Sequence, residues 1–235
     1  MHLDKYLIKS GYGTKEIVHK IIKENNVYVN SSLINDFHYE LEVSDIVSVN
    51  TKIKKYKEYH YIILNKPEGL VSSSKDNDNE TIFSLLPKEY SLLHLNIVGR
   101  LDKDVKGLIL LTNNNKLFKY LINPNNNVTK EYLVTYSGNS KFIDQDISKG
   151  VLLDNGYKTH PISLNIIDDN KAIIKINEGK FHEVKNIFLA LHMKVIELKR
   201  LKIGPLNLGD LKEKEYRKLT NEEINSLLSL LLKED

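Results

Sequence analysis

The chain of 235 residues contains no cysteine, which excludes disulfide bonds and thiolate metal sites. Its first residues lack the positively charged segment and the following apolar segment of a secretory signal. No apolar run approaches the roughly 20 residues that a membrane helix needs. We therefore expect a soluble, cytoplasmic protein that does not associate with a membrane.

The sequence also lacks a large excess of charge of either sign. Its 34 Lys and Arg residues against 31 Asp and Glu residues give a formal net charge of +3. A balance this small supports a polyanionic partner only weakly, and the distribution of the charges says more. Lysines gather in residues 51–60 and 180–202, although each segment taken alone is best explained as a solvated face.

The hydrophobic pattern predicts many strands and few helices. Apolar residues at helical spacing predict helices over residues 3–8, 116–122, 182–191 and 221–233, and one that begins after Thr14. Alternating apolar residues predict strands over 128–135, 162–167, 171–177 and 194–200, and short strands around Val27, Val43 and Val47. This order indicates an α+β fold, with a mixed, mainly antiparallel sheet and flanking helices.

Two domains are expected. Two short helices followed by short strands make residues 1–50 a compact module, and the lysine-rich residues 51–59 suit a linker. We place residues 1–57 in the small N-terminal domain with its basic linker and residues 58–235 in the larger domain. Within the larger domain, residues 72–79 are predicted to be a plain solvent-exposed loop.

The stretch from Gly99 to Asn113 holds the strongest candidate for chemistry. A glycine and a short charged turn precede Leu108–Leu111, which is predicted to be a buried strand that ends in a turn. Asp102 would then lie at the edge of the core, with its carboxylate facing a cleft. The spacing alone favours Asp102 as a turn cap, which is a common role of Asp.

This stretch, G-R-L-D-K-D-V-K-G-L-I-L-L-T-N, resembles the catalytic signature of the pseudouridine synthases of the ribosomal small-subunit (RsuA) type. The resemblance implies that Asp102 is the essential catalytic residue and that Arg100 and Leu101 contact the substrate. From the sequence alone, Arg100 could instead form a turn salt bridge with Asp104. Val105 departs from the family, which usually has Ser or Thr at this position.

Further segments match the same family in the same order, and they begin at Asn65, Lys130, Glu178 and Leu198. The resemblance implies that Tyr132 packs against the target base and that Lys185 pairs with the catalytic carboxylate. Taken singly, Tyr132 would be a core tyrosine and Lys185 a solvated lysine. Glu183 and Asn186 depart from the family's Gln and Arg. The resemblance implies RNA contacts at Lys130, Lys180, His182, Arg200 and Leu201.

The N-terminal residues resemble an S4 RNA-binding domain. The matching segments are Leu3–Leu7, Gly11–Lys15 and Val27–Asn30, with departures at His2 and Ser31. The resemblance implies that phosphates are contacted by Lys5, Thr14, Lys15 and Lys23. Such contacts supply affinity and position but little sequence information. Without the resemblance, the helix pair could equally be a structural cap.

The sequence therefore predicts an rRNA pseudouridine synthase that acts as a monomer on 16S rRNA within a pre-ribosomal particle. A 23S rRNA enzyme of the same family and a non-catalytic RNA-binding ribosome-assembly protein are the alternatives. The reaction neither oxidises nor hydrolyses anything, so we expect no cofactor and no metal. His182 is a poor metal-ligand candidate because no second His or carboxylate lies at ligand spacing.

Overall fold

The computed structural model describes residues 1–24, 26–42, 45–50, 52–53, 59–138 and 147–232. Its contacts divide the chain into two compact units, Met1–His60 with Leu86–Leu95, and Tyr61–Leu85 with Asn96–Asp235. The segment Leu86–Leu95, which the sequence placed in the larger domain, thus groups with the N-terminal unit. Of the expected linker, residues 51 and 54–58 lie outside the described residues, as does the predicted strand position Val43.

The first unit packs two helices against a small sheet. The helices are α1 (Leu3–Lys9) and α2 (Lys15–Lys23), and a 3-10 helix, η2, spans Lys88–Leu93. The sheet has the order β2-β1-β3-β4, with β1 Val27–Val29, β2 Ser32–Leu33, β3 Val47–Val49 and β4 Lys52–Ile53. Leucine, isoleucine and valine side chains of both helices, β1 and β3 form its core. Thr14 precedes α2 as expected, but its side chain makes no capping hydrogen bond to the helix.

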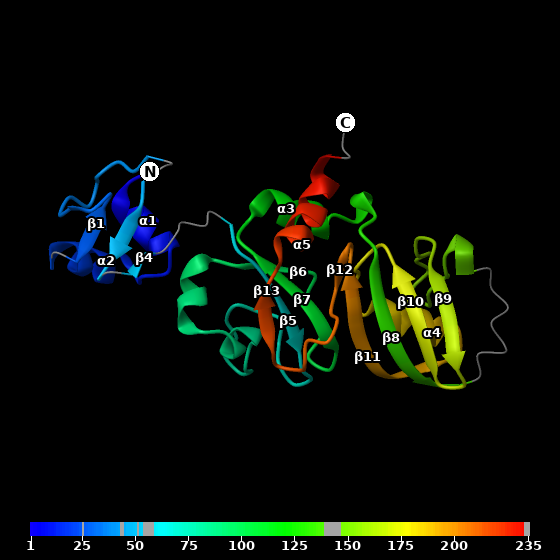
Figure 1. Ribbon diagram of the computed structural model, residues 1–235. Helices are drawn as coiled ribbons and strands as arrows, with labels where there is room; N and C mark the ends of the chain where they lie inside the picture. Colours follow the sequence, from blue (N-terminus) through cyan, green and yellow to red (C-terminus); the bar gives the residue numbers. More distant parts are fainter. Residues whose placement is uncertain (25, 43–44, 51, 54–58, 139–146, 233–235) are drawn as a thin grey trace. The chain divides into compact units, whose positions relative to one another are not determined.

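The second unit is built on one nine-stranded sheet in which the order β13-β5-β7-β11-β8-β10-β9 can be followed in Figure 1. β6 also pairs with β7, and β12 with β11. The strands are β5 Tyr61–Lys66, β6 Asn96–Val98, β7 Lys106–Thr112, β8 Lys130–Ser137, β9 Ser163–Asp168, β10 Lys171–Ile176, β11 Lys194–Ile203, β12 Leu206–Asn207 and β13 Tyr216–Lys218. All pairings are antiparallel except that between β7 and β11. The predicted mixed, mainly antiparallel α+β fold is confirmed.

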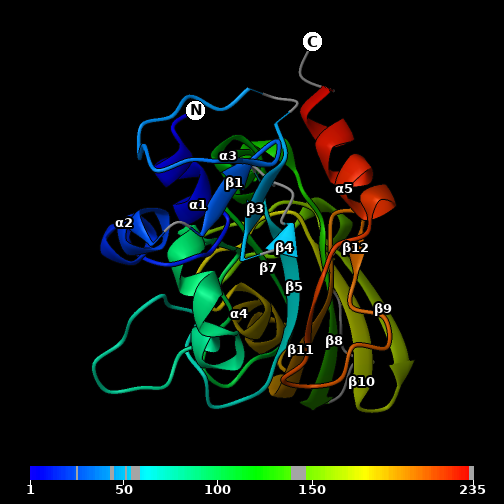
Figure 2. The ribbon, with the colours of Figure 1, turned by 60° about the vertical axis from the view of Figure 1, so that its left-hand side comes forward.

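Helices cover the sheet at separate places. They are α3 (Asn115–Ile122), α4 (Glu183–Ala190) and α5 (Asn221–Leu228), with 3-10 helices at Ile82–Leu85, Pro124–Asn126, Ile147–Lys149 and Ser229–Leu232. Apolar side chains of α3 and α5 pack with those of β5 and β7 in one core cluster. α4 packs beside β11 (Figure 2). None of the helices within the described ranges is both long and apolar enough to cross a membrane.

Gly107 lets the parallel strands β7 and β11 come together. It pairs with Arg200 in the register of these strands and has a φ of +109°. A Cβ at this position would clash with the carbonyl oxygen of Arg200 and lie 2.6 Å from its backbone nitrogen. Glycine is therefore required here for both its left-handed φ and its missing side chain.

We expect Gly107→Ala to lower the free energy of unfolding by about 3 to 5 kcal/mol, since backbone strain and a backbone clash add. Gly156→Ala is the matched control, because Gly156 has a φ of +79° but open space around its would-be Cβ. It should lose only about 1 to 2 kcal/mol. Urea unfolding measures both, and equal losses would contradict a steric role for Gly107.

Candidate active site

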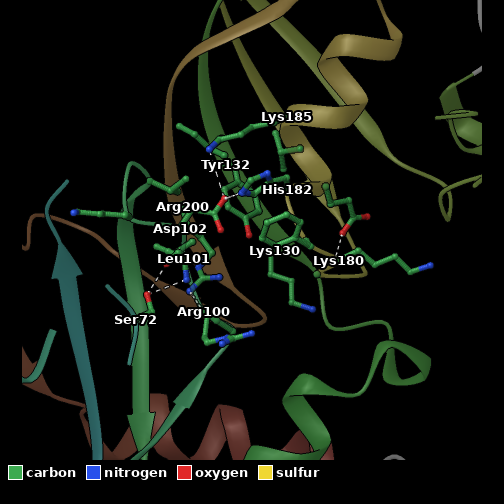
Figure 3. Close-up of a pocket in the computed structure, with 18 of the residues that line it drawn as sticks. Ser72, Arg100, Leu101, Asp102, Lys130, Tyr132, Lys180, His182, Lys185 and Arg200 are labelled. Atoms are coloured by element: carbon green, nitrogen blue, oxygen red, sulfur yellow. Dashed lines mark hydrogen bonds and ion pairs between the residues drawn. The ribbon is translucent and has the colours of Figure 1, made fainter. Parts of the chain in front are cut away.

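A cavity of about 530 Å³ in the second unit gathers the sequence motifs in one place (Figure 3). Its walls come from the loop 99–105, the strands β8, β10 and β11, and the segment 179–185. Most of the predicted substrate contacts line it: Arg100, Leu101, Asp102, Lys130, Tyr132, Lys180, His182, Lys185 and Arg200. Leu201 follows on β11 but is not among the lining residues.

Asp102 projects into this cavity from a tight turn. The turn is closed by the N–H of Val105, which donates to the carbonyl of Asp102 at 3.1 Å. The Asp102 side chain is 32% exposed, and its Oδ2 lies 3.3 Å from Nε2 of His182 and 3.6 Å from Nζ of Lys185. The carboxylate is thus partly shielded from water and flanked by two groups that attract negative charge.

Lys185 is shared between two carboxylates. Its Nζ donates to both oxygens of Asp104 at 2.8 Å, which is closer than its contact with Asp102. The hydrogen bond from Lys185 holds the pKa of Asp104 below its usual value. The Arg100–Asp104 salt bridge that the sequence allowed is not formed. Arg100 is exposed and makes no ion pair with any residue in the described ranges.

Ser72 anchors the backbone beside Asp102. Its Oγ donates to the carbonyl of Leu101 at 2.7 Å and accepts the N–H of Leu101 at 3.1 Å. Ser72 is 7% exposed, so the prediction of a plain solvent loop over residues 72–79 is wrong at its first residue. No periodic pattern marks this contact, because a lone serine in a polar run is indistinguishable from its solvated neighbours.

Lys66, the last residue of β5, holds the other end of the loop. It is fully buried, and its Nζ donates to the carbonyls of Pro67, Lys103 and Val105. Burial lowers the pKa of Lys66 to about 8, against the opposing charges of Asp104 and Asp102. Sequence reasoning missed this residue, although a lysine at the end of an apolar strand was the available signal.

Arg200 is a buried residue of the cavity wall. It is 2% exposed, its Nε donates to the carbonyl of Leu108 at 2.8 Å, and its Nη2 donates to that of Gly99 at 2.6 Å. The side chain binds the protein's own backbone, and the RNA contact predicted for Arg200 stays a prediction. Tyr132, its partner in the β8–β11 register, is 7% exposed with its ring 6.0 Å from the guanidinium.

Two stacked aromatic rings also line the cavity. The ring of Phe181 is 80% exposed and stacks on His182, with 3.7 Å between the ring centroids. His182 has a φ of 53°, in the left-handed region that a residue other than glycine rarely adopts. This conformation precedes α4, and in it Nε2 of His182 reaches the Asp102 carboxylate.

Ionisable side chains lie buried in the cavity wall. Burial and the nearby charge of Arg200 lower the pKa of Lys130 to about 8. Burial also raises the pKa of Glu183 to about 7. One oxygen of Glu183 accepts the N–H of Lys180 at 2.9 Å, whereas Oε1 has no hydrogen-bond partner among the described residues. The side chain of Lys180 lies 3.7 Å from Glu178.

The remaining predicted contacts belong to the first unit. Lys5, Thr14, Lys15 and Lys23 are all exposed there. Within the described ranges, no group of three or more His, Cys, Asp or Glu side chains could hold a metal ion. The arrangement around Asp102 suits chemistry by a carboxylate, as a nucleophile or as a base, beside an aromatic face and cationic groups.

Comparisons with known proteins lead to the same chemistry. Residues 60–190 match the family described as RNA pseudouridylate synthase. The chain is 34% identical to an uncharacterized RNA pseudouridine synthase of Bacillus subtilis, YtzG, over 97% of this chain and 98% of the relative. It is 32% identical to ribosomal small subunit pseudouridine synthase A of Escherichia coli, over 97% and 100%. A crystal structure of a pseudouridylate synthase matches with a TM-score of 0.66 and 32% identity, over 97% and 99%.

The buried carboxyl of Glu183 predicts a pH-dependent stability. Its pKa rises from 4.5 to about 7 on folding, so the folded protein binds the extra proton between these values. Stability is then greatest below pH 4.5 for this group and falls by about 3 kcal/mol as the pH rises to about 7. Glu183→Gln should remove that decrease, because the amide carries no charge.

Urea unfolding between pH 4.5 and 7.5 measures the difference between wild type and Glu183→Gln. Glu197→Gln is the control, since the side chain of Glu197 is 50% exposed and pairs with Lys106, which lowers its pKa. This variant should leave the decrease with pH in place. If wild type and Glu183→Gln lose stability in parallel as the pH rises, folding does not raise the pKa of Glu183.

Proposed function

The chain belongs to the RNA pseudouridylate synthase family, and from this premise we propose that it isomerises one uridine of 16S ribosomal RNA, with Asp102 as the catalytic carboxylate. The observation that carries the proposal is the meeting of Asp102, Tyr132 and Lys185 in a single cavity. The choice of 16S RNA rests on relatives named ribosomal small subunit pseudouridine synthase A, with which the similarity extends over 97% of this chain.

Isomerisation of uridine to pseudouridine requires mainly a carboxylate and a site that is shielded from water. The bond between N1 and C1′ breaks, the base turns, and C5 bonds to C1′. The proton that C5 loses is matched by the proton that N1 gains. Asp102 either bonds to C1′ or removes the proton at C2′, and both routes need it ionised. Lys185 and His182, both near its Oδ2, stabilise that charge.

The detached uracil must be held until it rejoins the sugar. Tyr132 offers a mostly buried ring in the cavity wall, where a base can stack. Leu101 and Lys130 line the same cavity and complete its contacts with the nucleotide. Arg100 is exposed at the rim, where its guanidinium can support the RNA beside the nucleotide that has flipped out.

RNA binding outside the cavity falls to the first unit. Its two helices and small sheet, with a charged face on α2, suit an S4 RNA-binding domain. Lys5, Thr14, Lys15 and Lys23 would contact phosphates there, and Lys180 would do so near the cavity. We place the enzyme in the cytoplasm, acting as a monomer on a pre-ribosomal particle.

The first test is pseudouridine mapping of both ribosomal RNAs from cells with the protein, without it, and with Asp102→Asn. We expect one 16S uridine to lose its modification both in the deletion and in Asp102→Asn. The variant's rate of uridine isomerisation should be at least about a thousandfold below that of the wild type. Asp104→Asn is the control. It removes the neighbouring carboxylate, leaves Lys185 to Asp102, and should keep most of the activity.

The mapping also separates the alternatives. Loss of a modified uridine in 23S RNA instead would overturn the choice of 16S RNA and leave the proposed pseudouridine synthase activity standing. Full modification by Asp102→Asn would remove Asp102 from the mechanism. No change at any rRNA uridine would overturn the ribosomal substrate and favour an assembly protein or another RNA.

Salt dependence tests the first unit. Each of Lys15→Ala and Lys23→Ala should weaken rRNA binding and lower the slope of log Kd against log salt by about 0.7 to 0.9, as one lost phosphate contact does. Lys20→Ala is the control on the same helix, because Nζ of Lys20 lies 3.7 Å from the Glu24 carboxylate, which offsets its charge. Fluorescence anisotropy between 50 and about 300 mM salt measures all three. An equal loss in Lys20→Ala would argue against specific phosphate contacts.

A further inference from the structure

A second cavity, of about 350 Å³, adjoins the one that holds Asp102. The two cavities share the lining residues Gly99, Arg100, Lys130, Gly179, Lys180 and Arg200. In Figure 3, Arg100 lies on the side of Asp102 away from Lys185. The isomerisation of a single uridine makes no use of the remaining walls of the second cavity.

Those remaining walls are mainly apolar and partly open to solvent. Ile97 and Phe118 are half-buried, Pro124 is exposed, and Ile122 at the end of α3 is 44% exposed. An aromatic ring among aliphatic side chains offers a surface for the face of a planar ring. Open apolar surface that lines a cavity, rather than lying scattered, is typical of a binding site.

The shared wall is cationic. Arg100 is exposed and pairs with no carboxylate in the described ranges. Lys180 is held in place, with its Nζ 3.0 Å from the ring centroid of Tyr157 and 3.7 Å from Oε1 of Glu178. Among these two side chains, Arg100 is therefore the one whose charge no carboxylate of the described residues offsets, and it stands between an apolar cavity and the cavity that contains the candidate catalytic carboxylate.

We propose that the second cavity binds the base of the nucleotide next to the target uridine in the RNA chain. Neighbouring nucleotides are joined by one phosphate, so bases in two adjoining cavities place that phosphate over their shared wall. Arg100 supplies its counter-charge. Stacking on apolar walls reads the face of a base rather than its edge, so the site accepts different bases. The inference rests on the proposed function only in placing the target uridine beside Asp102.

The test uses three seven-nucleotide RNAs with abasic positions everywhere except at named bases. The first carries only a central uridine, the second also has the base on its 5′ side, and the third has the base on its 3′ side. We expect one neighbouring base to tighten binding to the wild-type protein by about tenfold, which is within the range of stacking on protein side chains. The other neighbouring base should have little effect.

Ile122→Trp fills the second cavity and should abolish this gain while leaving the Kd for the RNA with only a central uridine within about twofold. Ile196→Trp is the matched control, since Ile196 is an isoleucine on β11 that is 63% exposed and lines neither cavity. It should keep the gain. Ile122→Glu, whose side chain is smaller, tests the same surface if the tryptophan variant unfolds at a lower temperature.

The outcomes are distinct. If neither neighbouring base adds affinity, or if Ile122→Trp and Ile122→Glu keep the gain, the second cavity does not bind a base. If the gain is lost in Ile122→Trp and kept in Ile196→Trp, the site is established as a base-binding site. A negative rRNA mapping result would overturn the proposed reaction alone, because the binding comparison does not depend on turnover.

Discussion

The buried guanidinium of Arg200 is the interaction on which the candidate active site depends. A charge removed from water needs hydrogen-bond partners, and Arg200 finds them in the carbonyls of Gly99 and Leu108. These two carbonyls bracket the loop that carries Asp102. One side chain of β11 therefore fixes where that loop leaves β6 and where it enters β7. The close approach that this requires is possible only because Gly107 has no side chain.

Lys66 and Ser72, like Arg200, hold the backbone of the loop that carries Asp102. The three side chains, from β5, from the loop after it and from β11, hold backbone groups on both sides of Asp102. Burial, with the charge of Arg200 adding to it, lowers the pKa of Lys66 and of Lys130 to about 8, so both are mostly protonated at neutral pH. Together with Arg200, these lysines place positive charge around the cavity, beside the buried carboxyl groups of Glu178 and Glu183. Such a field suits a carboxylate that must stay ionised and a polyanionic substrate.

The sequence predicted well what depends on local periodicity or on a contiguous motif. The helices at 3–8 and 116–122 and the strands at 162–167 and 171–177 agree with the structure to within a few residues. The meeting of Asp102, Tyr132 and Lys185 followed from the order of the motifs. The sequence could not show that Lys185 lies closer to Asp104 than to Asp102, because the two distances from its Nζ differ by less than 1 Å.

Contacts between side chains and distant backbone were beyond sequence reasoning. Ser72 and Leu101 are 29 residues apart, and Arg200 and Gly99 are 101 apart. No periodic pattern marks either pair. Two of the departures from the family, Val105 and Asn186, are likewise understood only from their surroundings in the fold. Val105 is 2% exposed and packs where a hydroxyl would need a partner, and Asn186 reaches only the carbonyl of Phe181. Val105 lines the cavity and Asn186 does not, and neither residue is among those paired with the Asp102 carboxylate, which are His182 and Lys185.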